Sequence, residues 1–263
     1  MERPVTAAAP PAAGIPAGAV RQYQERGWAV IPEVFSEREA DRVSAAAMRV
    51  SAAELASHPG QRFTVDASPS GELQPRKIDY PFLKHAGFRR FALDPRLASI
   101  AAAFLGRRAY LIRDQLFCKP PGFGTEKPYH QENAALLFDP PGDMLVTWVA
   151  LDPASEDNGC LRFIDASHHE LLDHNPVPGA PYHLVPDASA LDMSQESVVP
   201  AGKGSVIVIH SQALHGSAAN RSSEWRRAYS CHWVTGRVTC GTSALAYGYS
   251  RTVGQEPYPH RSP

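Results

Sequence analysis

Residues 204–234 read GSVIVIHSQALHGSAANRSSEWRRAYSCHWV and contain two apolar runs that a polar segment separates. The runs at 204–210 and 226–234 are rich in β-branched and aromatic residues, a composition that favours strands. Gly, Ser and Asn lie between the two runs and indicate a turn. The stretch therefore predicts two short strands, with His215 just after the first of them.

Runs of the same kind recur from residue 109 onward, bounded by Gly, Pro, Asp and Asn. They occupy residues 109–120, 144–153, 159–164, 183–186 and 197–201. Helical patterns come earlier, at residues 15–26, 36–56 and 93–106. Residues 28–35 predict a further strand, and the polar stretch 58–74 predicts a loop. Because no helical segment separates the later strands, repeated βαβ units are excluded, and we expect a mainly β fold with flanking helices, a sandwich or jelly roll.

Two of the predicted helices carry recognisable end signals. Ser36 can cap the second helix, and Glu39, three residues later, completes a capping box. Asp94 lies at the start of the third helix and Gly106 at its end, which is the usual placement of these two residue types.

The composition of the 263 residues is that of a globular protein, with 43% hydrophobic and 20% charged residues. A formal net charge of −1 gives no electrostatic basis for binding nucleic acid or an anionic membrane. The four cysteines form no C-x-x-C pair, which argues against a zinc ribbon and fits a reducing compartment. No apolar run approaches the roughly 20 residues that a membrane-spanning helix needs. We therefore expect a soluble, cytoplasmic protein.

The N-terminal residues 1–15 are rich in Ala and Pro, and prolines 10 and 11 interrupt any signal-peptide-like apolar core. We expect these residues to be a disordered tail. Residues 16–263 show no internal repeat and are expected to form a single domain.

A pair of metal-ligand residue types, His130 and Glu132, lies in the segment 128–138, PYHQENAALLF. An isolated H-x-E pair is weak evidence, but alternation along a strand would place residues i and i+2 on one face. Two His and one carboxylate on one face hold Fe(II) and leave positions open for a co-substrate and dioxygen. His215, from a strand far along the chain, is the candidate for the third ligand. His168 and His169 are not expected to bind metal, and His210 and His232 are interpreted as core or strand-edge residues.

Three segments resemble the signature regions of the phytanoyl-CoA dioxygenase family in both order and spacing. They are DQLFCKPPGFGTEKPYHQE at 114–132, TWVALDPASEDNGCLRFIDASHH at 147–169, and HGSAANRSSEWRRAYSCHW at 215–233. The last segment has the family pattern of a metal-binding His, then Gly-Ser, then an Asn, and an Arg eleven residues after the His. The resemblance follows the element order from about residue 22 to residue 233.

The resemblance implies a double-stranded β-helix, the cupin-like jelly roll, that holds Fe(II) and 2-oxoglutarate and uses O2. The implied iron ligands are His130, Glu132 and His215. The residues implied to contact the co-substrate are Arg226 and Ser217 at its distal carboxylate, together with Gln115, Trp148 and Lys77. A guanidinium suits this role because its planar fork binds a carboxylate through two parallel hydrogen bonds.

Two features of the sequence refine this assignment. The family's usual carboxylate ligand is Asp, whereas this chain has Glu132, which is one methylene longer. Related halogenases replace the acid with a small residue, so a carboxylate at this position argues against halogenation. Arg227 follows Arg226 directly, and strand alternation allows only one of them to face the interior; we expect it to be Arg226.

The expected function is a dioxygenase that hydroxylates or oxidatively cyclises a small molecule, such as a secondary metabolite or antibiotic. Ring closure on an oligosaccharide antibiotic, as in the orthosomycin oxygenases, and hydroxylation of a terpenoid or amino-acid-derived scaffold are both compatible with the sequence. Residues 58–74 and 170–195 are candidate substrate lids. The alternatives are a non-catalytic jelly-roll binding protein and a cupin-type isomerase or epimerase without 2-oxoglutarate. The oligomeric state is left open.

Overall fold

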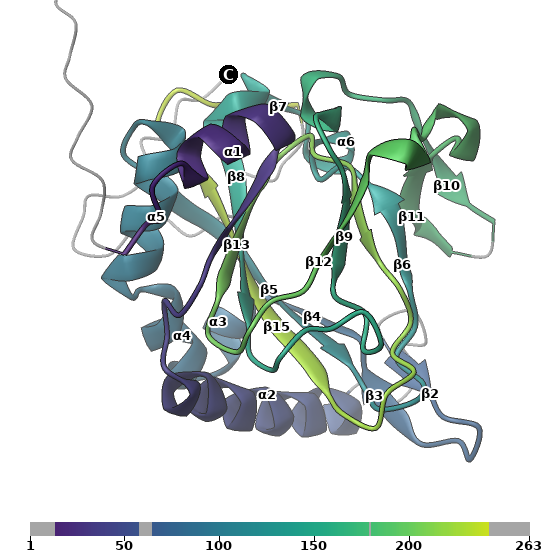
Figure 1. The fold of residues 1–263 in the computed structure, drawn as a ribbon. Helices are drawn as coiled ribbons and strands as arrows, with labels where there is room; N and C mark the ends of the chain where they lie inside the picture. Colours follow the sequence, from purple (N-terminus) through teal and green to yellow (C-terminus); the bar gives the residue numbers. More distant parts are fainter. Residues whose placement is uncertain (1–13, 58–64, 179, 242–263) are drawn as a thin grey trace, which may run out of the picture.

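Two antiparallel sheets face each other in the computed structural model, which describes residues 14–57, 65–178 and 180–241 (Figure 1). The larger sheet has, in order, β1 (Trp28–Ile31), β13 (Val206–His210), β8 (Met144–Ala150), β15 (Arg226–Val234), β5 (Tyr110–Lys119) and β4 (Lys77–Asp79). The smaller sheet has β12 (Glu196–Val199), β9 (Leu161–Ile164), β14 (His215–Ser217) and β6 (Lys127–His130). This arrangement is the double-stranded β-helix that the sequence predicts.

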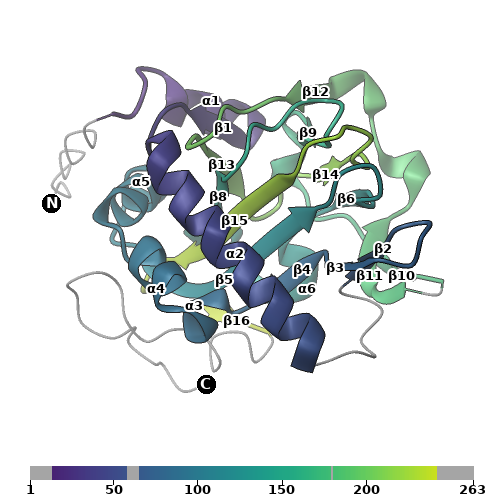
Figure 2. The same ribbon diagram turned by 90° about the horizontal axis from the view of Figure 1, so that it is seen from below.

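Three two-stranded sheets accompany the two larger sheets, and the first two of them are hairpins. They pair β2 (Val65–Ala67) with β3 (Leu73–Pro75), β10 (His174–Val177) with β11 (Ala180–Pro186), and β7 (Phe138–Asp139) with β16 (Thr239–Cys240). The two hairpins lie on the same side of the molecule, next to β6 (Figures 1 and 2).

The helices lie mainly on the outer face of the larger sheet, where α2 crosses β5 and β15 (Figure 2). The α-helices are α1 (Ala19–Arg26), α2 (Glu37–Ser57), α3 (Pro81–Lys84), α4 (Ala86–Ala92), α5 (Pro95–Leu105) and α6 (Asn133–Leu136). Short 3-10 helices occupy Pro141–Asp143, Ser167–His169, Ala188–Ala190 and Met193–Gln195. Among the described residues, no helix combines the length and the apolar character needed to cross a bilayer.

The buried side chains of β15 alternate between two hydrophobic cores, one on each face of the larger sheet. Tyr229, Cys231 and Trp233 are fully buried against the helices on the outer face of the larger sheet. Ala228 and Val234 belong instead to the core between the two sheets. The alternation follows from the two-residue period of a strand, which sends neighbouring side chains to opposite faces. Both faces of the larger sheet are therefore covered.

The end signals that the sequence predicts are present. Asp94 caps α5 by accepting a hydrogen bond from the Arg96 backbone N–H, and Gly106 ends the helix in a left-handed conformation with φ 63°. The Ser36 Oγ accepts a hydrogen bond from the Glu39 N–H (3.3 Å), and the Glu39 carboxylate accepts one from the Ser36 N–H (2.8 Å). The capping box is therefore confirmed.

The prediction of a continuous loop at 58–74 is wrong for its second half. Residues 65–74 belong largely to the β2–β3 hairpin, whereas residues 58–64 lie outside the described residues. The sequence also gives no signal for β4, α3 and α4, because elements this short complete too few periods to be recognised. The division into a tail at 1–15 and a domain at 16–263 stays a prediction, since residues 1–13 and 242–263 are not described.

We expect Ser36→Ala to lower the free energy of unfolding by about 1 kcal/mol, because the variant loses the cap of α2. Ser57→Ala is the matched control: it removes a hydroxyl at the opposite end of the same helix, where Oγ donates only to the Ala53 carbonyl. The control should change stability by less than about 0.5 kcal/mol. Urea unfolding measures both, and equal stabilities would show that the capping box contributes nothing.

Candidate metal centre

His130 and His215 are direct partners across two neighbouring strands of the smaller sheet. His130 is the last residue of β6, His215 is the first of β14, and their ring centroids are 4.3 Å apart. Glu132 lies beyond the end of β6, in helical backbone just before α6. Strand alternation, which the sequence suggested, therefore does not bring Glu132 to the site; the turn after His130 does.

The three side chains direct their donor atoms to one point. Glu132 Oε1 lies 3.6 Å from His130 Nε2 and 3.8 Å from His215 Nε2. Three donors on one face of an octahedral metal, each at about 2.1 Å, would be roughly 3 Å apart, so small side-chain shifts suffice to close around an ion. No other group of three His, Cys, Asp or Glu within the described ranges has its ligand atoms this close.

Backbone carbonyls set the tautomer of both histidines. His130 Nδ1 lies 3.0 Å from the Pro128 carbonyl, and His215 Nδ1 lies 3.0 Å from the Ala213 carbonyl. A carbonyl oxygen can only accept, so each Nδ1 carries the proton and donates it. Each Nε2 therefore presents its lone pair to the common point, as metal-ligating histidines do.

The protonation states also suit a metal centre. Burial, and then the charges of Lys127 and His215, lower the pKa of His130 to about 3. Burial likewise lowers the pKa of His215. Burial alone would raise the pKa of Glu132, but His130 and His232 more than offset it, so that this pKa lies well below its usual range. At neutral pH the cluster therefore consists of two neutral imidazoles and one carboxylate.

His232, interpreted from the sequence as a core or strand-edge residue, contacts the cluster from β15. Its side chain is fully buried, and Nε2 lies 3.5 Å from Glu132 Oε2. Neither ring nitrogen has a hydrogen-bond partner among the described residues. Since buried polar nitrogens are almost always hydrogen-bonded, the second oxygen of Glu132 is the natural partner of Nε2. His232 thus leaves Oε1 as the oxygen that faces the other two histidines.

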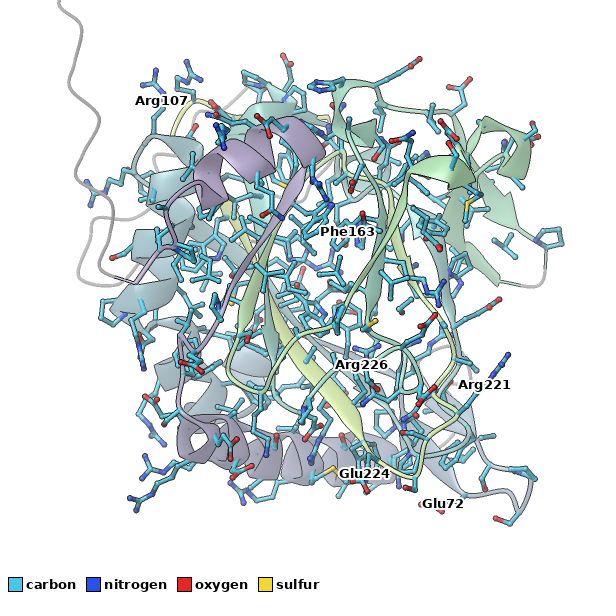
Figure 3. All side chains as sticks on the ribbon, in the orientation of Figure 1. Glu72, Arg107, Phe163, Arg221, Glu224 and Arg226 are labelled. Atoms are coloured by element: carbon cyan, nitrogen blue, oxygen red, sulfur yellow. The ribbon has the colours of Figure 1, made fainter. Side chains whose placement is uncertain are left out.

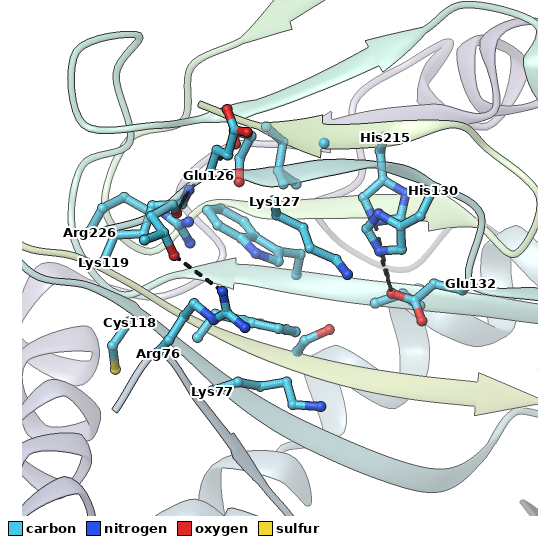
Figure 4. Close-up of a pocket in the computed structure, with 18 of the residues that line it drawn as sticks. Arg76, Lys77, Cys118, Lys119, Glu126, Lys127, His130, Glu132, His215 and Arg226 are labelled. Carbon is cyan, nitrogen blue, oxygen red and sulfur yellow. Dashed lines mark hydrogen bonds and ion pairs between the residues drawn. The ribbon is translucent and has the colours of Figure 1, made fainter. Parts of the chain in front are cut away.

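A cavity of about 340 Å³ extends from this cluster between the two sheets (Figure 4). His130, Glu132 and His215 lie at one end, and Arg226 lies at the opposite end. Ser217 and Trp148 also line the cavity, and the Arg226 guanidinium lies 5.6 Å from the centre of the Trp148 ring. These predicted site residues therefore share one pocket.

Arg226 is a buried guanidinium that has no acidic partner among the described residues. Only 3% of the residue is exposed, and Nε has no hydrogen-bond partner among the described residues. Figure 3 shows Arg226 inside the molecule, whereas Arg221 and Glu224 lie at its edge. Burial lowers the pKa of Arg226 to about 10, so the group still carries its charge at neutral pH. A charge in such a site needs a counter-ion.

Arg227 faces the other side of β15 and is fully paired. Its Nε and Nη2 each donate to the Asp152 carboxylate at 2.7 Å. The structure thus places Arg226 in the pocket and Arg227 outside it, as alternation along the strand requires.

The other two predicted co-substrate residues differ in position. Lys77 lines the pocket, and its ammonium lies 3.1 Å from the Asp79 carboxylate. Gln115 is not among the lining residues; its amide nitrogen donates to Asp79 at 2.7 Å. Burial would raise the pKa of Asp79, but Lys77, Arg113 and Gln115 together hold it at about 2. Gln115 is therefore connected to the pocket through its hydrogen bond to Asp79.

Two lysines in the pocket wall were not identified from the sequence. Lys119 is 3% exposed, and its amine donates to the carbonyls of Thr125 (2.7 Å) and Ala218 (2.5 Å). Burial lowers its pKa to about 6, and burial lowers that of Lys127 to about 8. Lys119 belongs to the K-P-P segment and Lys127 lies three residues before His130, so the quoted motifs contain both without marking them as pocket residues.

A protein-family model described as phytanoyl-CoA dioxygenase (PhyH) matches residues 23–228. A phytanoyl-CoA dioxygenase domain-containing protein 1 from Danio rerio is 31% identical over 150 residues, which are 55% of this chain and 52% of the relative. The chain spans about half the length of the first curated relatives that it matches.

Solved structures with the same fold include EvdO2 from Micromonospora carbonacea var. aurantiaca, crystallised with 2-oxoglutarate. It is 24% identical, with a TM-score of 0.68, and the match covers 84% of this chain and 91% of EvdO2. A second is SnoK, described as a non-heme α-ketoglutarate-dependent carbocyclase from nogalamycin biosynthesis. It is 23% identical, with a TM-score of 0.66 and 86% of each chain covered. At this level of identity, the likeness shows the fold.

We expect His130→Ala and His215→Ala each to abolish Fe(II) binding at micromolar metal, because two remaining ligands cannot hold a labile divalent ion. The control is His169→Ala, which removes an exposed histidine outside the cluster. Anaerobic equilibrium dialysis followed by metal analysis measures all three variants. Stoichiometric iron in both ligand variants would rule out this metal centre.

We expect His232→Phe to keep the fold and weaken Fe(II) binding by about 10- to 100-fold, the usual effect of removing the partner of a metal ligand. The ring shape is retained, but Glu132 Oε2 loses the nitrogen that lies 3.5 Å away. His232→Gln should restore part of the affinity because the amide can donate. Wild-type affinity in a folded His232→Phe protein would show that His232 does not orient the carboxylate.

Proposed function

Because the chain belongs to the phytanoyl-CoA dioxygenase family, we propose that it is an Fe(II)- and 2-oxoglutarate-dependent oxygenase. The observation that carries this proposal is the buried Arg226 guanidinium, which has no acidic partner in the described part of the chain and lies in the same pocket as the three-residue metal cluster. A metal-binding protein that needs no dicarboxylate has no reason to bury an unpaired positive charge there.

In this proposal, His130, Glu132 and His215 hold the iron, and Arg226 and Ser217 bind the distal carboxylate of 2-oxoglutarate. When bound, iron and 2-oxoglutarate together with O2 supply the oxidation: one oxygen atom enters succinate, which forms with CO2, and the other is available for the substrate. The Trp148 ring lies beneath the Arg226 guanidinium, which is 5.6 Å from the ring centre. The chain's task is thus to position the reactants and exclude water.

Of the two segments expected to cover the substrate, 170–195 contributes to the lining of this pocket, whereas 58–74 ends two residues before the lining residue Arg76. His183 of β11 lines the cavity, as does Arg76, which lies between β3 and β4, and the Arg76 Nη2 lies 3.2 Å from the His183 Nε2. This contact joins the residue that follows β3 to the β10–β11 hairpin. We propose that the β2–β3 and β10–β11 hairpins contact the substrate.

The proposed substrate is a small molecule of the natural-product type. The resemblance in fold to EvdO2 and to SnoK, the latter assigned to nogalamycin biosynthesis, supports this class. Phe117, Val146 and Ile209 give the wall an apolar part, which suits a carbon skeleton. Hydroxylation and oxidative ring closure both begin with attack on a substrate C–H bond, and the pocket is compatible with either.

The two alternatives explain fewer of the observations. A non-catalytic jelly-roll protein would not need three ligand side chains with both histidine tautomers fixed for metal binding. An isomerase that works without 2-oxoglutarate would not need Arg226. Anaerobic addition of Fe(II) and 2-oxoglutarate tests the proposal directly, because a visible charge-transfer band forms only when the co-substrate chelates the iron. Absence of the band with iron-loaded protein would contradict the proposal.

We expect Arg226→Ala to weaken 2-oxoglutarate binding by roughly 30-fold to several thousandfold, because truncating one partner of a buried charge pair costs about 2–5 kcal/mol. Iron binding should survive, since Arg226 is not a ligand. Lysine at position 226 should restore only part of the affinity, because a point charge cannot reproduce the two parallel hydrogen bonds. Titration by the charge-transfer band measures each variant.

The control is Arg227→Ala, whose effect on 2-oxoglutarate affinity should be below about tenfold because the side chain lies on the opposite face of β15. This variant leaves the Asp152 carboxylate unpaired, so it should lower the unfolding temperature instead. If neither arginine affects binding, the assignment of the co-substrate is wrong.

A further inference from the structure

The pocket contains positively charged side chains to which the proposed function assigns no role. Five Lys and Arg side chains line it in the described part of the chain: Arg76, Lys77, Lys119, Lys127 and Arg226. Three of them are bonded within the protein. Arg76 contacts Thr125 and His183, Lys77 pairs with Asp79, and Lys119 donates to backbone carbonyls.

Lys127 and Arg226 differ from the other three. Arg226 Nε is buried without a hydrogen-bond partner among the described residues. Lys127 forms no ion pair with a described residue, although the charge of Glu132 acts on its amine. Arg226 lies at the end of the pocket far from the metal cluster, whereas the Lys127 amine points toward His130 and Glu132 (Figure 4). The pocket thus offers one unpaired positive group at each end, as a ligand with two carboxylates would require.

A bulge in β6 is the reason that Lys127 faces inward. His215 pairs with His130 and Ser217 pairs with Lys127, so two residue steps along β14 match three steps along β6. The extra residue lies between Lys127 and His130, and it restores Lys127 to the face that Ser217 and His215 share. Without the bulge, a residue three positions before His130 would face outward, because side chains alternate along a strand. Tyr129, one position before His130, does face outward, and its hydroxyl donates a hydrogen bond to Glu196.

Gly216 permits the close approach of the two strands at this bulge. A Cβ at position 216 would lie 2.9 Å from the Lys127 carbonyl oxygen and 3.2 Å from the Tyr129 nitrogen. Both contacts are with backbone atoms, which cannot move aside as a flexible side chain could. The Gly between His215 and Ser217 is thus needed for the same irregularity that directs Lys127 into the pocket.

We propose that Lys127 binds the metal-proximal carboxylate of 2-oxoglutarate, opposite the distal carboxylate that Arg226 binds. This inference rests on the proposed function and adds a second point of recognition to it. A carboxylate bound to a metal through one oxygen keeps its other oxygen free to accept a hydrogen bond from the ammonium. Lys127 would then fix the orientation of the 2-oxo acid at the iron.

The test compares two ligands and two variants on anaerobic Fe(II)-loaded protein by isothermal titration calorimetry. The ligands are 2-oxoglutarate and 2-oxopentanoate, which keeps the 2-oxo acid but has a methyl group in place of the distal carboxylate. Lys127→Met should weaken both by a similar factor of about 10 to 100, the range for a hydrogen bond to a charged group. Arg226→Met should weaken 2-oxoglutarate strongly and 2-oxopentanoate by less than about threefold, since the latter lacks the group that Arg226 binds.

Lys203→Met is the matched control, because this lysine pairs with Asp41 outside the pocket and its loss should leave both affinities unchanged. Lys127→Arg should recover part of the affinity. Stoichiometric iron and an unchanged melting temperature in Lys127→Met would confirm that the variant is folded.

Two results would overturn the inference. If Lys127→Met weakens only 2-oxoglutarate, Lys127 serves the distal carboxylate; if it weakens neither ligand, its amine does not bind the co-substrate. Failure of the proposed function itself gives a different result, because the wild-type protein would then bind neither 2-oxo acid in an iron-dependent manner.

Discussion

His130 and His215 are cross-strand partners, and the register of β6 against β14 determines which side chains of these two strands face the pocket. A shift of one residue would turn one of the two histidines to the outer face, because side chains alternate along a strand. The same pairing, through its bulge, brings Ser217 and Lys127 to the inner face. Two metal ligands and two residues of the pocket wall therefore depend on the pairing of β6 with β14, whereas Glu132 and Arg226 come from other segments.

Strand β15 places its two arginines on opposite faces of the larger sheet. Arg227 is neutralised by Asp152 on the side of the helices, whereas Arg226 enters the pocket without an acid. His232, six residues later on the same inner face, contacts Glu132. One strand thus supplies the proposed partner of the distal carboxylate and the partner of a metal ligand. Arg226 lies at the end of the pocket opposite the metal cluster, and His232, farther along the same strand, lies at the cluster.

The charge of the pocket could not be inferred from that of the chain. A formal net charge of −1 excludes a strongly basic protein, yet five Lys and Arg side chains line a single cavity in the described residues. Asp79, Glu126 and Glu132 line the same cavity and offset part of this charge, and in the rest of the chain Asp and Glu outnumber Lys and Arg. Local charge follows from which residues the fold brings together, and the sequence total does not constrain it.

The sequence by itself determined the β-rich fold, the capped helices α2 and α5, and the residue types of the metal cluster. These features follow from periodicity, end signals and motif spacing, which are local properties of the chain. Only the tertiary structure decided that a turn, and not a strand, positions Glu132, and that His232 contacts it. It also decided the inward orientation of Lys127, since a bulge depends on how two distant strands pair. Non-local pairing leaves no local pattern, and for this reason these residues could not be assigned from the sequence.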